Sequence, residues 1–212
     1  MSEPGHVFLV DDDVSILVSF RRALERCGHH VTTFESPVSF LRDAVLEPPA
    51  CLVVDLRMAE TNGLEVQAVV ARRAEWLSVI FVSGCADIRS SVEAMKHGAF
   101  DFLVKPFAPE VLVAAVEGGL AQSATRAMLL DKRRAAQDLL RRLSPRERQV
   151  ADMILAGLRN AEIGLRLGTS EKTVRFHRLN LMRKLEIHSI TELVRLRSQA
   201  GETPSAAEAG RP

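Results

Sequence analysis

The chain has 212 residues, enough for two small domains, and a formal net charge of only +1. The charge is uneven: residues 1–118 hold 10 Lys/Arg against 17 Asp/Glu, whereas residues 119–198 hold 17 against 8. The 3 cysteines show no CxxC spacing, and no apolar run approaches the roughly 18 residues of a membrane span. A disulfide scaffold and a membrane protein are therefore excluded, and a cytoplasmic protein is expected.

In the acidic half, short apolar runs alternate with helical patterns. The runs lie at 6–10, 30–34, 51–54, 77–82 and 101–104, and helical patterns follow near 15–26, 37–45, 64–73, 88–97 and from residue 109 onward. Such βα units with short connections predict one parallel sheet with helices on both faces. Right-handed crossovers favour an α/β fold of the flavodoxin-like type, with the five parallel strands in the order 2-1-3-4-5.

Polar groups follow four of these predicted strands. The first run ends in 11–13 (Asp-Asp-Asp), the third in Asp55, the fourth in Ser83 and the fifth in Lys105. In the predicted order these strands are neighbours, so their carboxyl ends gather the groups at one edge. Clustered carboxylates need a cation, and oxygen-only ligands favour Mg²⁺. One carboxylate could then act as a nucleophile and accept a phosphoryl group.

With these motifs in order, residues 6–120 resemble a response-regulator receiver domain. The resemblance implies that Asp55 is the phosphoacceptor. It also implies that Asp12 binds Mg²⁺ directly together with Asp55, that Asp11 acts through water, and that the Arg57 backbone carbonyl completes the protein ligands.

The same resemblance assigns the remaining groups at this edge. Lys105 is expected to contact the phosphoryl group, and the Lys-Pro bond that follows is expected to be cis. Ser83 and Phe102 are the expected switch residues, the first hydrogen-bonding the phosphoryl group and the second turning inward. Asp13 fits a helix N-cap better than a metal ligand.

An alternative reading is a Mg²⁺-dependent aspartate-nucleophile phosphatase. The run 11–15 (Asp-Asp-Asp-Val-Ser) loosely fits the DxDx(T/V) loop of such enzymes, which would make Asp11 the nucleophile. That loop prefers Thr or Val where Ser15 stands, and such enzymes need a second acid pair later in the chain. A protein that is not an enzyme is therefore expected.

Residues 109–142 are rich in good helix formers and predict a long linker helix, with a possible kink where glycines 118–119 interrupt it. The expected layout is a receiver domain at 1–120, a linker helix at 121–142, an all-α domain of four helices at 143–198 and a disordered tail at 199–212.

The basic half carries the signals of a helix-turn-helix. Ser144 and Glu147 form a predicted capping box. Asn160 is expected to cap a short helix over 161–167, and Ser170 a third helix that begins after the turn at Gly168.

The third helix is predicted over 171–185 and holds 5 Lys/Arg against 1 Glu. Val174, Leu181 and Leu185 can face the core, while the other side suits a major-groove recognition helix. The candidate DNA contacts are Lys172, Thr173, Arg175, Phe176, His177, Arg178 and Asn180.

Residues 143–197 resemble a LuxR-type helix-turn-helix, through the LSPRE opening, the GLxNxEI middle and the KTVxxHxxNxxRKL helix. A fourth helix near 190–196 serves dimerisation in that family. Together the halves resemble a two-component response regulator of the FixJ/NarL type. The resemblance implies phosphorylation of Asp55 by a sensor histidine kinase, dimerisation, binding to double-stranded operator DNA, and contact with RNA polymerase.

Overall fold

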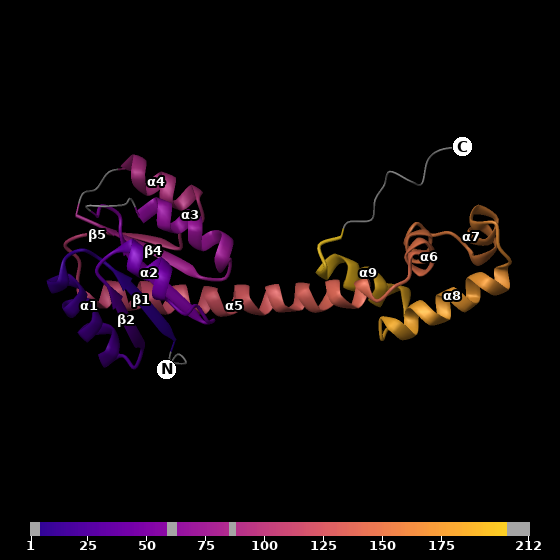
Figure 1. The fold of residues 1–212 in the computed structure, drawn as a ribbon, viewed down its shortest axis with the longest axis horizontal. Coiled ribbons are helices and arrows are strands. Elements are labelled where there is room, and N and C mark those ends of the chain that lie inside the picture. Colours follow the sequence, from indigo (N-terminus) through magenta and orange to yellow (C-terminus); the bar gives the residue numbers. More distant parts are fainter. Residues whose placement is uncertain (1–4, 59–62, 85–87, 203–212) are drawn as a thin grey trace. The chain divides into compact units, whose positions relative to one another are not determined.

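A computed structural model describes residues 5–58, 63–84 and 88–202 of the chain (Figure 1). The chain divides into two compact units, Met1–Met128 and Leu129–Pro212, which are described in turn. The finer division predicted from the sequence stays a prediction. Residues 203–212 of the expected tail lie outside the described ranges.

The first unit is built on a sheet of five parallel strands. They are β1 (His6–Val10), β2 (His30–Phe34), β3 (Ala50–Asp55), β4 (Ser78–Ser83) and β5 (Asp101–Val104), in the order β2-β1-β3-β4-β5. Every residue of β3 and β4 is buried, as continuous apolar runs in a two-sided sheet require. The predicted strand order and parallel sheet are confirmed.

Helices cover both faces of this sheet. On one face, side chains from α2 (Pro37–Asp43), α3 (Gly63–Arg73) and α4 (Ile88–Lys96) form one core with the strands. On the other, α1 (Val14–Arg26) and the first part of α5 (Pro109–Arg141) form a second core. Both cores anchor the strands, and hold their carboxyl ends in fixed register.

The helix α5 runs through the glycine pair at 118–119 without a break, so these residues do not end the helix. A Cβ on Gly118 would lie 2.8 Å from the Phe100 ring, and one on Gly119 would lie 2.9 Å from the Cys51 Sγ atom. The glycines therefore allow α5 to approach the sheet closely.

The second unit consists of helices packed around one core. After the last part of α5 come α6 (Pro145–Leu155), α7 (Asn160–Leu167), α8 (Glu171–Lys184) and α9 (Ile190–Gln199). Ala136 and Leu140 of α5 are buried in this core. The disordered tail was predicted to begin at residue 199. That start is wrong, because α9 extends to Gln199 and the following residue, Ala200, is buried.

Local capping sets the helix starts in this unit. The predicted capping box is confirmed: the Glu147 backbone N–H donates to the Ser144 hydroxyl, and the Glu147 carboxylate accepts from the Ser144 backbone N–H. The predicted cap at Asn160 is wrong, because α7 already includes that residue. Arg159 precedes the helix instead, and its backbone N–H donates to the Glu162 carboxylate at 2.6 Å.

Candidate functional site

The carboxyl edge of the first sheet brings an ammonium group between two carboxylates. The Lys105 Nζ atom lies 2.9 Å from the Asp11 Oδ2 atom and 2.9 Å from the Asp55 Oδ1 atom. Lys105 follows β5, Asp11 follows β1, and Asp55 ends β3, so three separate strands supply the cluster. The expected meeting of these residues is confirmed.

Backbone N–H groups hold both carboxylates in place. The Arg57 N–H donates to the Asp55 Oδ2 atom at 2.7 Å, and the Asp13 N–H donates to the Asp11 Oδ1 atom at 2.9 Å. Each carboxylate thus uses one oxygen for the backbone and the other for Lys105. Sequence reasoning missed these donors, because any residue type can supply a backbone N–H.

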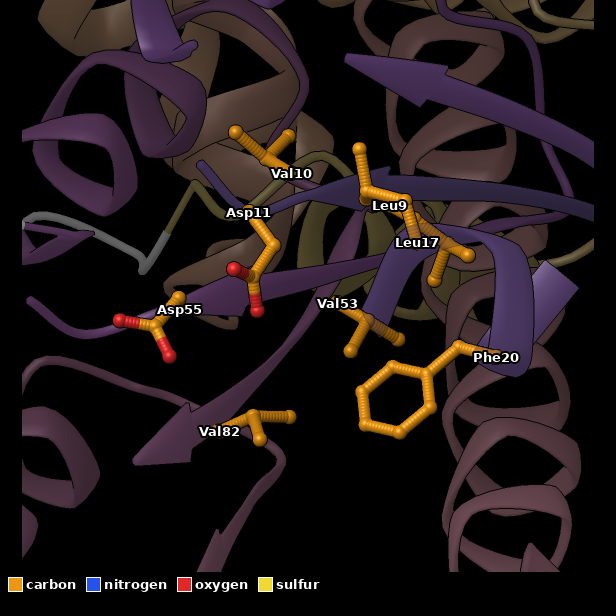
Figure 2. Close-up of a pocket in the computed structure, with 8 residues that line it drawn as sticks. All are labelled: Leu9, Val10, Asp11, Leu17, Phe20, Val53, Asp55 and Val82. Carbon is orange, nitrogen blue, oxygen red and sulfur yellow. The ribbon is translucent and has the colours of Figure 1, made fainter. Parts of the chain in front are cut away.

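The two acids border a small pocket with apolar walls (Figure 2). Asp11 and Asp55 are 5 % and 8 % exposed, and Figure 2 shows both among the side chains that line this pocket. The other residues around the pocket are Leu9, Val10, Leu17, Phe20, Val53 and Val82. Such walls limit hydration of the acids and strengthen their attraction to a cation.

Burial and charge act in opposite directions on these groups. Desolvation raises the pKa of Asp11, and its hydrogen bonds and the charge of Lys105 only partly oppose that rise. Burial alone would lower the pKa of Lys105, but the hydrogen bonds and charges of Asp11 and Asp55 outweigh it and raise that pKa. Lys105 therefore stays an ammonium group at neutral pH.

Two loops complete the edge. Asp13 caps α1, because its carboxylate accepts from the Ser15 backbone N–H at 2.8 Å, as predicted. A hydrogen bond from the Ser15 hydroxyl, together with the one from its backbone N–H, lowers the pKa of Asp13. Asp12, which lies between Asp11 and Asp13 in the chain, is exposed. A Cβ on Gly63 would lie 2.7 Å from the Asp55 carbonyl oxygen, so only glycine lets α3 begin this close to the strand end.

The expected switch residues occupy neighbouring strands. Ser83 is 1 % exposed at the end of β4, and its carbonyl accepts from the Lys105 backbone N–H at 2.8 Å. Phe102 is half-buried on β5, opposite Phe81, with ring centroids 6.4 Å apart. Register places Ser83 and Phe102 on the same face of the sheet. The bond between Lys105 and Pro106 is cis, as expected.

In the second unit, α8 has a buried side and an exposed side. Val174, Leu181 and Leu185 are buried, as predicted, and they fix the orientation of the helix. The candidate DNA contacts lie on the opposite or flanking faces of the helix. Lys172, Arg175 and Phe176 are exposed, and Thr173, His177, Arg178 and Asn180 are partly buried.

Several of these polar side chains already have partners within the unit. Arg175 pairs with Glu171 at 2.6 Å, and Arg178 donates to the Asn160 side-chain oxygen of α7 at 3.3 Å. The Asn180 side-chain oxygen accepts from Arg183 at 3.4 Å. These contacts pre-position the basic side chains, and a bound polyanion would have to exchange with some of them.

Comparisons with known proteins agree with both units. Residues 7–117 match the family described as response regulator receiver domain, and residues 141–197 match bacterial regulatory proteins of the luxR family. The chain therefore belongs to the response regulators that join a receiver domain to a LuxR-type DNA-binding domain. It is a transcriptional regulator of two-component systems, and nothing supports the phosphatase alternative.

Particular relatives cover nearly the whole chain. The transcriptional regulatory protein FixJ of Azorhizobium caulinodans is 38% identical over 97% of this chain and 97% of its own length. The response regulator protein TmoT of Ectopseudomonas mendocina is 37% identical over 90% of this chain and 86% of its own. The solved structure of response regulator StyR superposes with a TM-score of 0.79 at 36% identity, covering 92% of this chain and 99% of that one.

Proposed function

We propose that Asp55 accepts a phosphoryl group from a sensor histidine kinase. The observation that carries this proposal is the ammonium group of Lys105 within 2.9 Å of both Asp55 and Asp11. A fixed cation beside a carboxylate stabilises the negative charge that a phosphoryl group brings. The Arg57 N–H orients the Asp55 carboxylate, which borders the pocket and is 8 % exposed.

The residues at this edge fit Mg²⁺. The donors are carboxylates and a backbone carbonyl, and the raised pKa of Asp11 reflects a desolvated carboxylate that a cation would stabilise. Within the described ranges no three acidic, histidine or cysteine side chains form a ready metal site. Mg²⁺ usually takes one or two carboxylates with water and phosphate oxygens. Asp12 and Asp55, the Arg57 carbonyl, and Asp11 through water would hold it and neutralise phosphoryl charge.

Ser83 and Phe102 are the proposed switch. A phosphoryl group on Asp55 offers the Ser83 hydroxyl a strong acceptor, and Phe102 lies on the same face of the next strand. Movement of Ser83 toward the phosphoryl group would leave space that the Phe102 ring can fill. The change would then reach the surface formed by α4, β5 and α5.

The proposed output is regulation of transcription through operator DNA. The exposed side of α8 would enter the major groove, with Lys172, Arg175 and Arg178 near phosphates or bases. Thr173, Phe176, His177 and Asn180 are the remaining proposed contacts. Phosphorylation would promote a homodimer that binds two half-sites and contacts RNA polymerase.

The same proposal places the protein in the cytoplasm, as a regulator rather than an enzyme. None of the described helices is long and apolar enough to cross a membrane. The kinase and the operator are its expected macromolecular partners, with no role for a membrane.

The test of the phosphoacceptor is a mass measurement. The full-length protein is incubated with a small phosphodonor, with and without Mg²⁺, and weighed intact. A gain of one phosphoryl group that needs Mg²⁺ is expected for the wild type and not for Asp55→Asn. Asp13→Asn, at the helix cap, is the matched control and should still gain it. A gain that survives Asp55→Asn would show that another residue is the acceptor.

A further inference from the structure

Two large apolar side chains lie exposed in the middle of α8. Phe176 is 60% exposed and Leu179 is 68% exposed, whereas Val174 and Leu181 on the same helix are fully buried. Positions three apart on a helix are neighbours on one face. The pair therefore forms a continuous apolar strip that the core of this unit does not use.

Positive charge surrounds this apolar strip. The helix carries 5 Lys/Arg against 1 Glu, and Lys172 and Arg183 lie four residues before Phe176 and four residues after Leu179. A partner that fits must be a polyanion that also presents apolar groups within reach of a helix. Duplex DNA has this combination, since phosphates flank the major groove and the thymine 5-methyl group projects into it.

The basic neighbours are less free to read bases. Arg175 pairs with Glu171 at 2.6 Å, and Arg178 donates to Asn160 at 3.3 Å. Each of these contacts must be exchanged before its arginine reaches a base edge. Phe176 and Leu179 have no hydrogen-bonding side-chain group to release, and burying them against a methyl group is favourable.

We infer that Phe176 and Leu179 read thymine 5-methyl groups on adjacent base pairs of the operator half-site. The inference rests on the proposed role of α8 as the recognition helix. Residues three apart are separated by about 4.5 Å along a helix axis, close to the roughly 3.4 Å step between base pairs. Sequence discrimination at these steps is then set by apolar contact, while the basic side chains mainly supply affinity.

The experiment removes single methyl groups from the DNA. The phosphorylated full-length protein selects duplexes from a random library, and the selected duplex is remade with each thymine replaced in turn by deoxyuridine. Base pairing is retained, and only the 5-methyl group is lost. At two neighbouring positions we expect about fourfold weaker binding, the equivalent of about 0.8 kcal/mol for one buried methyl group.

Two variants connect this effect to the side chains. The variants are Phe176→Ala and Leu179→Ala. The DNA affinity of each variant should no longer change with one of the two deoxyuridine substitutions. Both side chains are exposed, so truncation leaves the core intact, which circular dichroism checks. Binding to random duplex and its salt dependence should not change. Leu165→Ala removes an apolar side chain that is 84% exposed on α7 and should keep both sensitivities.

The outcomes separate this inference from the role of α8. If the wild type selects no duplex over random DNA, the proposed recognition helix is wrong and the inference falls with it. If a site is selected but deoxyuridine has no effect, or weakens wild type and variants equally, only the inference is overturned. A change of oligomeric state in Phe176→Ala or Leu179→Ala, with methyl sensitivity intact, would overturn it in favour of a protein contact.

Discussion

At the scale of single residues, Lys105 balances two acids that would otherwise repel each other. Its ammonium group lies 2.9 Å from a carboxylate oxygen of Asp11 and of Asp55. The sequence predicted this meeting, because strand order alone brings the three residues to one edge. The backbone donors of Asp13 and Arg57 escaped prediction, since their direction depends on loop conformation rather than residue type.

Removal of this cation should slow phosphorylation. The Lys105→Met variant has a side chain of similar length, but that side chain presents no charge to the incoming phosphoryl group. We expect phosphorylation by a small phosphodonor to slow about a hundredfold, as when a single oxyanion donor is removed. Intact mass against time measures the rate. Lys105→Arg keeps the charge in a planar group and should lose less. A Met variant that reacts at the wild-type rate would exclude this role.

Glu147 joins a helix cap to an ion pair in the second unit. Its carboxylate accepts from the Ser144 backbone N–H and lies 2.6 Å from the Lys184 Nζ atom. Burial alone would raise the pKa of Glu147, but the bonds from Lys184 and Ser144 outweigh it and lower that pKa. Sequence predicted the cap, but the pairing with Lys184 depends on the packing of α8 against α6 and had no local signal.

This lowered pKa gives the second unit a pH-dependent stability. When a carboxylate has a lower pKa in the folded than in the unfolded protein, its ionised form stabilises the fold. For Glu147 this stabilisation is fully present at pH values above the unfolded pKa of 4.5, and it is lost as the pH falls through the folded pKa. Glu147→Gln keeps the cap acceptor but loses the charge. We expect about 1.5 kcal/mol lower stability at pH 7, with the difference from wild type vanishing in acid.

Amide hydrogen exchange of α6 and α8 in the full chain measures that difference. Glu186→Gln is the control, because Glu186 is 73% exposed and pairs with Arg142 at 3.5 Å. Exposed pairs contribute little, so its effect should be a few tenths of a kcal/mol. A pH-independent difference between Glu147→Gln and wild type would contradict the expectation.

At the scale of elements, the strands were the most predictable parts. The runs at 6–10, 30–34 and 101–104 match β1, β2 and β5 residue for residue, because turn-forming and polar residues bound them. The glycines at 118–119 were harder, since a glycine pair predicts weak helix from propensity alone. Tertiary packing decided there: α5 stays helical because it lies against the sheet.

For a glycine-to-alanine substitution, the packing explanation predicts a loss of stability, whereas helix propensity predicts a gain. Gly119→Ala should gain about 1 kcal/mol from propensity, but its Cβ would lie 2.9 Å from the Cys51 Sγ atom in a buried core. Overpacking costs about 1–3 kcal/mol, so we expect net destabilisation of about 1 kcal/mol. Urea unfolding of the receiver unit in the full chain measures it.

A second substitution isolates the contact. Cys51→Ala removes the Sγ atom, so in the double variant Gly119→Ala should cost less than it does in the wild-type background. The difference, a coupling energy of about 1 kcal/mol or more, reports the contact between the two positions. Additive effects, or a stabilised single variant Gly119→Ala, would show that packing does not explain these glycines.

At the scale of the whole molecule, the proposed dimerisation requires phosphorylation to alter a surface that two copies can share. Four partly exposed apolar residues mark a candidate on the first unit: Val92 and Met95 of α4, Val104 of β5 and Val111 of α5. Phe102 lies in the same strand as Val104, so its movement would reach this surface directly. We propose these elements as the dimer face because the Ser83 and Phe102 switch would change their surface, whereas the exposure of the four side chains required the structure.

The free energy that phosphorylation must supply to switch the receiver can be bounded. Shifting a two-state receiver from 1:99 to 99:1 requires about 5.5 kcal/mol of differential stabilisation. Charge-assisted hydrogen bonds of the phosphoryl group to Lys105 and Ser83 are of the right order, at about 1.5–3 kcal/mol each. In the proposed mechanism, dimerisation would then strengthen DNA binding, because two half-sites would be engaged together.

The last prediction tests this link between phosphorylation and assembly. Sedimentation of the wild type should show mainly monomer without a phosphodonor and dimer with it, and operator affinity should rise in parallel. Met95→Glu places a charge on the proposed face and should keep phosphorylation but abolish the dimer, because burying an unpaired charge is costly. Val38→Glu, on the 56% exposed Val38 of α2, is the control and should still dimerise. A wild type that is fully dimeric and binds operator equally well without phosphorylation would instead mean that the receiver acts after assembly, for example through contact with RNA polymerase.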